Sequence, residues 1–132
     1  MIFAFYGSLR PGMYNYERFQ LDKLGKHLNT VTIPGYKMYS VMDWYPKIFA
    51  GSSQDTIVVD IVEINDRPTV NFIEAMERGA GYKSEKITIG DIEATLYVGE
   101  GKPAPNMEKS LVPSGDWVKY DTERTNVNTT SK

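Results

Sequence analysis

Near its start the chain carries the stretch Phe3-Ala4-Phe5-Tyr6-Gly7-Ser8-Leu9-Arg10-Pro11-Gly12. Every residue from 2 to 6 is apolar or aromatic, which predicts a buried strand. Gly7 then lets the backbone turn without a clash at Cβ and approach a ligand closely. A strand that ends in a loop of small residues presents several free backbone N–H groups together, and such a group cradles anions. We therefore expect this loop to hold a small acidic substrate.

The composition excludes several classes of protein. The chain has 132 residues, enough for one domain with its own core. A formal net charge of -2 and the absence of a basic run argue against non-specific nucleic-acid binding. Without cysteine there is no disulfide, thiol catalysis or thiolate metal site. The only histidine, His27, is interpreted as a surface residue beside Lys26.

We expect a cytoplasmic protein without a membrane partner. No apolar stretch approaches the roughly 20 residues that span a bilayer. The first residues also lack the charged, apolar and small-residue regions of a signal peptide.

Strand patterns dominate the chain. We expect further strands over residues 30–33, 36–42, 56–64, 82–89 and 92–98. The run 56–64 is rich in β-branched residues, and Gly90-Asp91 separates two alternating runs that predict a hairpin. Residues 43–55 contain proline, glycine and serine, which indicates a long surface loop. The aromatic residues around it, which either form a lid or interface or pack against the sheet, are Tyr36, Tyr39, Trp44 and Tyr45.

Two helices are expected, a short one over residues 15–24 and a longer one that ends near Arg78. The longer one starts at Asn65-Asp66-Arg67-Pro68, because a short polar side chain caps a helix and proline is tolerated in its first turn. Since strands outnumber helices, we predict an α+β domain with a mixed sheet that can curl into a barrel. This domain covers residues 1–122, and the polar segment 123–132 is expected to be a disordered tail.

Glu77 is the candidate catalytic residue of the longer helix. Val70, Ile73 and Met76 recur every three residues and mark the buried face, so Glu77 lies at its edge while Glu74 points further toward solvent. Partial burial and the negative C-terminal end of the helix both raise the pKa of a carboxylate, and a pKa near neutrality suits proton transfer. The alternative is a solvated glutamate near a helix end.

Asp60 is the second carboxylate of interest, because it interrupts the apolar strand 56–64. Val58 and Val62 share its face of the strand. The sequence leaves open whether this face lines a pocket or meets solvent.

Two motifs together resemble one family. Tyr6-Gly7-Ser8-Leu9-Arg10, followed by Gly12 and Asn15, resembles the opening signature of the gamma-glutamylcyclotransferase-like (AIG2-like) family. Ile73-Glu74-Ala75-Met76-Glu77, with Tyr82 beyond it, is similar to the family's hydrophobic-Asp-x-x-Glu-Gly segment and the tyrosine that follows it. The order and separation of the two motifs make the resemblance stronger than either motif alone.

A weaker third match is Gly115-Asp116-Trp117, so the resemblance spans roughly residues 2–117. The chain departs from the family pattern at Arg78, where a glycine is usual, and at Glu74, where an aspartate is usual. It also has Val59-Asp60 where Gly-Glu is frequent and Tyr16 where a histidine is common. The candidate base Glu77 is retained, whereas residues near the expected pocket differ from the family pattern.

The resemblance implies a fold, a reaction and a site. The family fold is a small mixed β-barrel with flanking helices, and its best-known members cyclise gamma-glutamyl groups, releasing 5-oxoproline and a free amine. The resemblance assigns Glu77 as general acid/base and implies that no metal or organic cofactor is needed. The substrate-binding residues that it implies are Tyr6, Gly7, Ser8, Leu9, Asn15 and Tyr82.

Two rival interpretations remain at this stage. The first is a binding module that uses the same loop for an acidic metabolite or a partner protein without turnover. The second is a small β-rich protein whose motifs only make tight turns.

Overall fold

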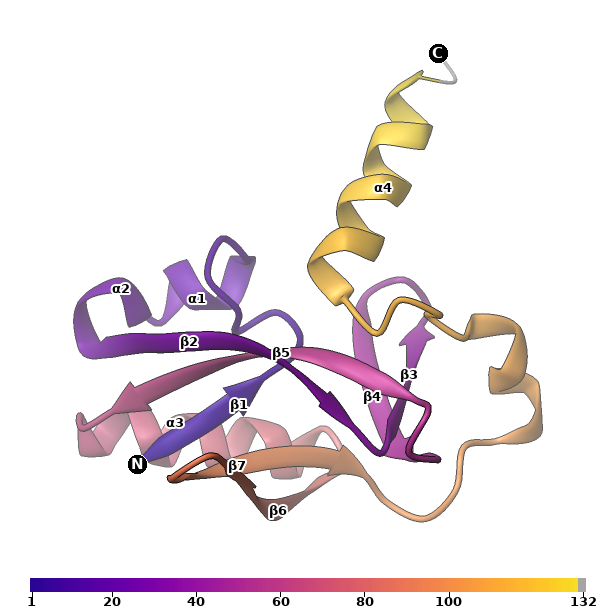
Figure 1. Cartoon of the computed structure of the whole chain (residues 1–132). Coiled ribbons are helices and arrows are strands. Elements are labelled where there is room, and N and C mark those ends of the chain that lie inside the picture. Colours follow the sequence, from indigo (N-terminus) through magenta and orange to yellow (C-terminus); the bar gives the residue numbers. More distant parts are fainter. Residues whose placement is uncertain (131–132) are drawn as a thin grey trace.

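The structure is a computed structural model that describes residues 1–130. Seven strands, four α-helices and one 3-10 helix follow one another along these residues (Figure 1). In order they are β1 (Ile2–Phe5), α1 (Tyr14–Arg18), α2 (Leu21–Leu24), β2 (Gly25–Pro34), β3 (Tyr36–Val41), β4 (Tyr45–Ala50), β5 (Thr56–Ile64), α3 (Arg67–Gly79), β6 (Tyr82–Ile89), β7 (Ile92–Gly99), η1 (Pro105–Ser110) and α4 (Trp117–Thr130).

Five of the strands form one mixed sheet in the order β2-β5-β1-β7-β6. The central strand β1 is antiparallel to β5 and parallel to β7, which confirms the expected α+β fold with a mixed sheet. The expected barrel is wrong, because β2 and β6 stay at opposite edges of the sheet. The strands β3 and β4 pair with each other in a separate two-stranded sheet.

The β3–β4 hairpin corrects the prediction of a long loop over residues 43–55. Residues Tyr45–Ala50 form β4, paired with β3 from Val41↔Tyr45 to Tyr36↔Ala50. Pro46 is tolerated because each strand of a two-stranded sheet is an edge strand. The hairpin was missed because its turn contains Met42 and Asp43, both with positive φ, instead of the usual glycine or asparagine.

The helices follow the predictions to different degrees. The single helix expected over 15–24 is two short helices, because Gln20 adopts a left-handed conformation between α1 and α2. The longer helix is confirmed as α3: the carboxylate of Asp66 accepts a hydrogen bond from the backbone N–H of Thr69 at 3.2 Å. Val70 and Ile73 are buried where α3 packs on the sheet.

Helix α4 extends away from the sheet toward the C-terminus (Figure 1). It begins at the buried Trp117, and its first turns are tied to the β3–β4 turn by hydrogen bonds from Tyr120 and Arg124 to Asp43. Residues 123–130 belong to this helix, whereas the sequence predicted a disordered tail there. Residues 131–132 lie outside the described residues. Within residues 1–130, no helix has both the length and the apolar composition needed to cross a membrane.

Candidate active site

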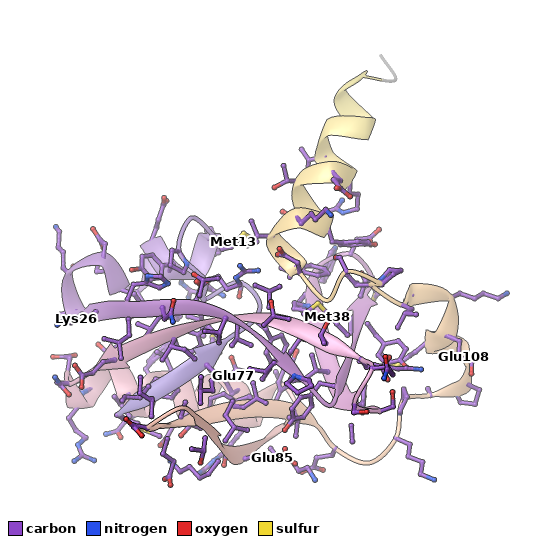
Figure 2. All side chains as sticks on the ribbon, viewed as in Figure 1. Met13, Lys26, Met38, Glu77, Glu85 and Glu108 are labelled. Atoms are coloured by element: carbon purple, nitrogen blue, oxygen red, sulfur yellow. The ribbon has the colours of Figure 1, made fainter. Side chains whose placement is uncertain are left out.

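A cavity of about 210 Å³ opens where β1 ends and the following loop begins. Its walls bring together segments that are far apart in the chain: the β1 loop, the start of α1, the last turn of α3, and β4, β6 and β7. All seven residues that the sequence nominated line this cavity: Tyr6, Gly7, Ser8, Leu9, Asn15, Glu77 and Tyr82. In Figure 2, Glu77 is seen against β1 and β7, well inside the outline of the molecule, whereas Glu108 lies at its outer edge.

The loop after β1, here called the cradle loop (residues 7–9), is held in shape by hydrogen bonds. The backbone N–H of Arg10 donates to the carbonyl of Gly7, and that of Asn15 donates to the carbonyl of Ser8, both at 3.0 Å. The side-chain amide of Asn15 also donates to the Ser8 hydroxyl at 2.7 Å. Among residues 1–130, the backbone N–H groups of Ser8 and Leu9 donate to no backbone carbonyl outside the helices and strands, which makes them candidate donors to a ligand.

Gly7 allows β4 to approach the cradle loop closely. A Cβ atom built on Gly7 would lie 2.9 Å from Cγ of Pro46 and 3.0 Å from its Cδ. Pro46 is itself part of the cavity wall. The glycine therefore serves the packing of this wall as well as the turn.

Glu77 is half-buried in the last turn of α3, and burial raises the pKa of its carboxyl group to about 7. The sequence had predicted a raised pKa from burial and from the helix end; in the structure the cause is burial. A raised pKa suits a carboxyl group that both accepts and returns a proton near neutral pH.

Three tyrosines surround Glu77. Burial raises the pKa of Tyr6, Tyr82 and Tyr97, and the nearby Glu77 carboxylate raises each of them further. The hydroxyl of Tyr6 donates to the backbone carbonyl of Tyr97 at 2.6 Å, and that of Tyr82 donates to the carbonyl of Pro46 at 2.7 Å. These bonds connect β1 with β7 and β6 with β4, and they keep the walls of the cavity together.

Sequence reasoning missed two tyrosines of the cavity, Tyr97 and Tyr45. Tyr97 alternates with apolar residues along β7, in company with polar Glu93 and Thr95, so its pattern resembled a solvent face. Tyr45 belonged to the aromatic group for which a lid, an interface or packing was left open; it lines the cavity and meets Tyr82 edge-on at 6.5 Å between ring centroids. Trp44 beside it is 76% exposed.

Two polar atoms of the cavity residues are buried without a hydrogen-bond partner within the described chain: Oδ1 of Asn15 and the hydroxyl of Tyr97. Buried polar groups in native proteins are nearly always paired, so each exception calls for an explanation. Both residues line the same cavity. Their unmet hydrogen bonds make these two side chains candidate partners for a bound molecule.

Asp60 lies outside the cavity lining and is buried rather than solvent-facing, so neither open alternative for it describes the structure. One oxygen lies 2.7 Å from Nε of Arg10, and the other lies 2.8 Å from Nε2 of His27. Burial alone would raise the pKa of Asp60, but hydrogen bonds from Arg10, Thr30 and His27 hold it below its usual value. His27, expected as a plain surface residue, is 37% exposed at its side chain and belongs to this cluster.

The described residues contain no group of three or more histidine, aspartate or glutamate side chains placed to hold a metal ion.

Comparison with known proteins agrees with the fold and the two motifs. The model of the family described as "Gamma-glutamyl cyclotransferase, AIG2-like" matches residues 3–119. The chain belongs to this family, and the resemblance inferred from the motifs is confirmed. Among curated proteins the sequence has no match.

Several solved structures share the fold over nearly the whole chain. An uncharacterised protein from Pyrococcus horikoshii is 25% identical, with a TM-score of 0.76 and coverage of 96% of this chain and 97% of that one. The protein ytfP from Escherichia coli is also 25% identical, with a TM-score of 0.68 and coverage of 92% and 99%. An AIG2-like protein from Mus musculus, 14% identical with a TM-score of 0.69, covers 87% of this chain and 86% of its own and shows likeness of fold alone.

Proposed function

We propose that the protein is a gamma-glutamyl cyclotransferase-type enzyme that releases 5-oxoproline and a free amine from a gamma-glutamyl amine, peptide or isopeptide. One observation carries the proposal: Glu77, whose carboxyl group has a pKa of about 7, lines the same cavity as the cradle loop, whose Ser8 and Leu9 N–H groups are candidate donors. Membership of the family supports the reaction type.

In this reaction the substrate reacts with itself. Its α-amine nitrogen attacks its γ-carbonyl carbon, and ionised Glu77 accepts the proton that the nitrogen must lose. A new C–N bond closes the five-membered ring. Glu77 then gives the proton to the departing nitrogen, the old C–N bond breaks, and the carboxylate is regenerated. Because both reacting groups belong to one bound molecule, orientation supplies much of the acceleration.

The cavity provides partners for the substrate's polar groups. The N–H groups of Ser8 and Leu9 suit the negatively charged α-carboxylate or the developing oxyanion. The free Oδ1 of Asn15 suits an N–H of the α-amine. A volume of about 210 Å³ lies below the roughly 300–1,000 Å³ of sites for drug-sized ligands, which fits a small acyl group.

The experiment is an assay for 5-oxoproline with a panel of gamma-glutamyl amines, dipeptides and isopeptides. We expect Glu77→Gln to lower product formation by roughly 10²- to 10⁴-fold, the usual range for a general acid–base group. Glu74→Gln is the matched control, because Glu74 lies one turn earlier on the same helix and outside the cavity lining. We expect it to change the rate by no more than a few-fold.

Two results would contradict the proposal. Product formation that does not respond to Glu77→Gln would reject the assignment of the base. Binding of gamma-glutamyl compounds, measured by calorimetry, without formation of 5-oxoproline would favour the binding module, which uses the same cavity without turnover.

A further inference from the structure

We propose that Tyr97 is a further catalytic residue of this site, whose phenolic hydroxyl donates a hydrogen bond to the γ-carbonyl oxygen while negative charge develops on it. This inference rests on the proposed cyclotransferase function. It gives the task of stabilising the γ-carbonyl oxygen to Tyr97, which belongs to neither of the two family-like motifs.

The ring of Tyr97 is held firmly in place. The strands β1 and β7 are parallel, and Ala4 is paired with Leu96. The next residue of β7, Tyr97, therefore lies beside Phe5, the next residue of β1. Its ring stacks on that of Phe3 at 6.3 Å between centroids, and the residue is only 4% exposed. A donor held by rigid packing needs little reorganisation when the reaction takes place.

The hydroxyl of Tyr97 has no partner within the described chain, although it is buried. The other two tyrosines around Glu77 differ in this respect, because Tyr6 and Tyr82 both donate to backbone carbonyls. Their hydroxyls serve the fold, whereas that of Tyr97 does not. A buried hydroxyl without a hydrogen-bond partner lowers the stability of a fold. Such a hydroxyl on a residue that lines a cavity therefore indicates a ligand that accepts the missing hydrogen bond.

The protonation state of Tyr97 suits a donor. Burial raises its pKa, the carboxylates of Glu74 and Glu77 raise it further, and Arg78 opposes them without reversing the direction. The hydroxyl therefore keeps its proton at neutral pH. Glu77 and Tyr97 both line the cavity.

The two side chains then divide the chemistry. Glu77 moves the proton between the two nitrogens, while the Tyr97 hydroxyl donates a hydrogen bond to the γ-carbonyl oxygen. As the new C–N bond forms, the electron pair of the carbonyl π bond moves onto the oxygen, and the hydrogen bond from Tyr97 stabilises that charge without giving up its proton. When the old C–N bond breaks, the same pair re-forms the carbonyl. The cradle loop is left free to bind the α-carboxylate.

The test is Tyr97→Phe, which removes the hydroxyl and keeps the ring. Removing one oxyanion donor typically lowers kcat by roughly 10²- to 10³-fold, and we expect a loss of this size with KM changed by no more than a few-fold. Tyr36→Phe is the control, because the hydroxyl of Tyr36 donates to Glu85 and the residue is outside the cavity lining. Its kcat should stay within two- to three-fold of that of the parent enzyme.

Thermal unfolding separates a catalytic role from a structural one. Because the Tyr97 hydroxyl is unpaired, Tyr97→Phe should melt at the same temperature as the parent protein or higher, whereas Tyr36→Phe loses a hydrogen bond and should melt lower. A Tyr97→Phe protein with a lower Tm and an unchanged kcat would overturn the inference.

A binding experiment keeps the inference testable if the parent protein proves inactive. The protein is labelled with ¹³C at the ζ carbon of tyrosine and titrated with 5-oxoproline, whose lactam oxygen is the former γ-carbonyl oxygen. We expect the Tyr97 signal, assigned by its loss in Tyr97→Phe, to shift on binding while the Tyr36 signal does not, and the variant to bind more weakly. With no turnover, this result would reject the proposed reaction but retain the contact. Failure of 5-oxoproline to bind, or binding without that shift, would overturn the contact.

Discussion

The guanidinium Nε of Arg10 lies 2.7 Å from Oδ2 of Asp60, and both side chains are almost completely buried. Arg10 immediately follows the cradle loop, and Asp60 lies in the middle of β5. A second bond of 2.7 Å joins Nη1 of Arg10 to Oδ1 of Asp116, just before α4. This arginine therefore fixes the end of the cradle loop to two segments that are 50 and 106 residues away in the chain.

Loss of the charge on Asp60 should cost far more stability than loss of the charge on Asp116. Removing one partner of a buried ion pair typically costs about 3–5 kcal/mol, because the other charge is left buried without compensation. We expect Asp60→Asn to approach the lower end of that range, since asparagine retains one acceptor. Asp116 is more exposed, so Asp116→Asn should cost about 1 kcal/mol or less. Urea unfolding of both variants at pH 7 measures the difference, and equal losses would contradict the role assigned to burial.

Glu77 should make the fold less stable as the pH rises. Burial raises its pKa from 4.5 to about 7, so the folded state holds a proton that the unfolded state has already lost between these values. Stability therefore falls with increasing pH across this window. Replacement by glutamine removes the penalty, and each pKa unit corresponds to about 1.4 kcal/mol, reduced by partial solvent exposure.

We expect Glu77→Gln to be more stable than the parent protein by roughly 1–3 kcal/mol at pH 8, with little difference at pH 4.5. The measurement is urea unfolding of both proteins at the two pH values. The phenols of Tyr6, Tyr82 and Tyr97, which face Glu77, stay protonated over this range because their pKa values are raised. A stability difference that is the same at both pH values would show that Glu77 titrates normally.

Adding a methyl group at Gly7 should damage the site more than the fold. The new Cβ would lie 2.9 Å from Cγ of Pro46, so the wall contributed by β4 must move away from the cradle loop. We expect Gly7→Ala to remain folded and to lose at least tenfold in kcat/KM for the gamma-glutamyl substrate. Gly79→Ala is the control, because a Cβ there meets nothing within 4 Å. Equal activity of both variants would show that the cavity tolerates displacement of β4.

The β3–β4 turn should be open to stabilisation. Met42 has a φ of 56° and is 76% exposed, so a methionine is held in a left-handed conformation without burying its side chain in return. Asparagine adopts this conformation more readily, and Met42→Asn should raise stability by about 0.5–1 kcal/mol. Asp43 should be left unchanged, since its carboxylate accepts hydrogen bonds from Ser40 and Tyr120. Thermal unfolding of the two proteins checks the prediction, and a lower Tm for Met42→Asn would contradict it.

The elements that could be predicted from the sequence are those with local signals. The run of β-branched residues in β5, the Asp66 cap of α3 and the Gly90-Asp91 turn each depend on residues that are neighbours in the chain. The β3–β4 hairpin has no such signal, because its turn uses Met42 and Asp43. Whether the sheet closes depends on its two distant edges, which is why the barrel could not be excluded from the sequence.

The candidate site shows the same division. By itself the sequence determined which residues were candidates. The backbone freedom of glycine and the acidity of glutamate are properties of the residue type, wherever the residue lies in the fold. Only the tertiary structure decided that Glu77 and the cradle loop line one cavity and that burial raises the pKa of Glu77. It also decided that the Tyr97 hydroxyl is buried without a partner in the described chain, while Asp60 pairs with Arg10 outside the cavity. The physical reason is that burial and charge pairing are set by neighbours in space, and in this protein those neighbours come from strands and helices that are far apart in the chain.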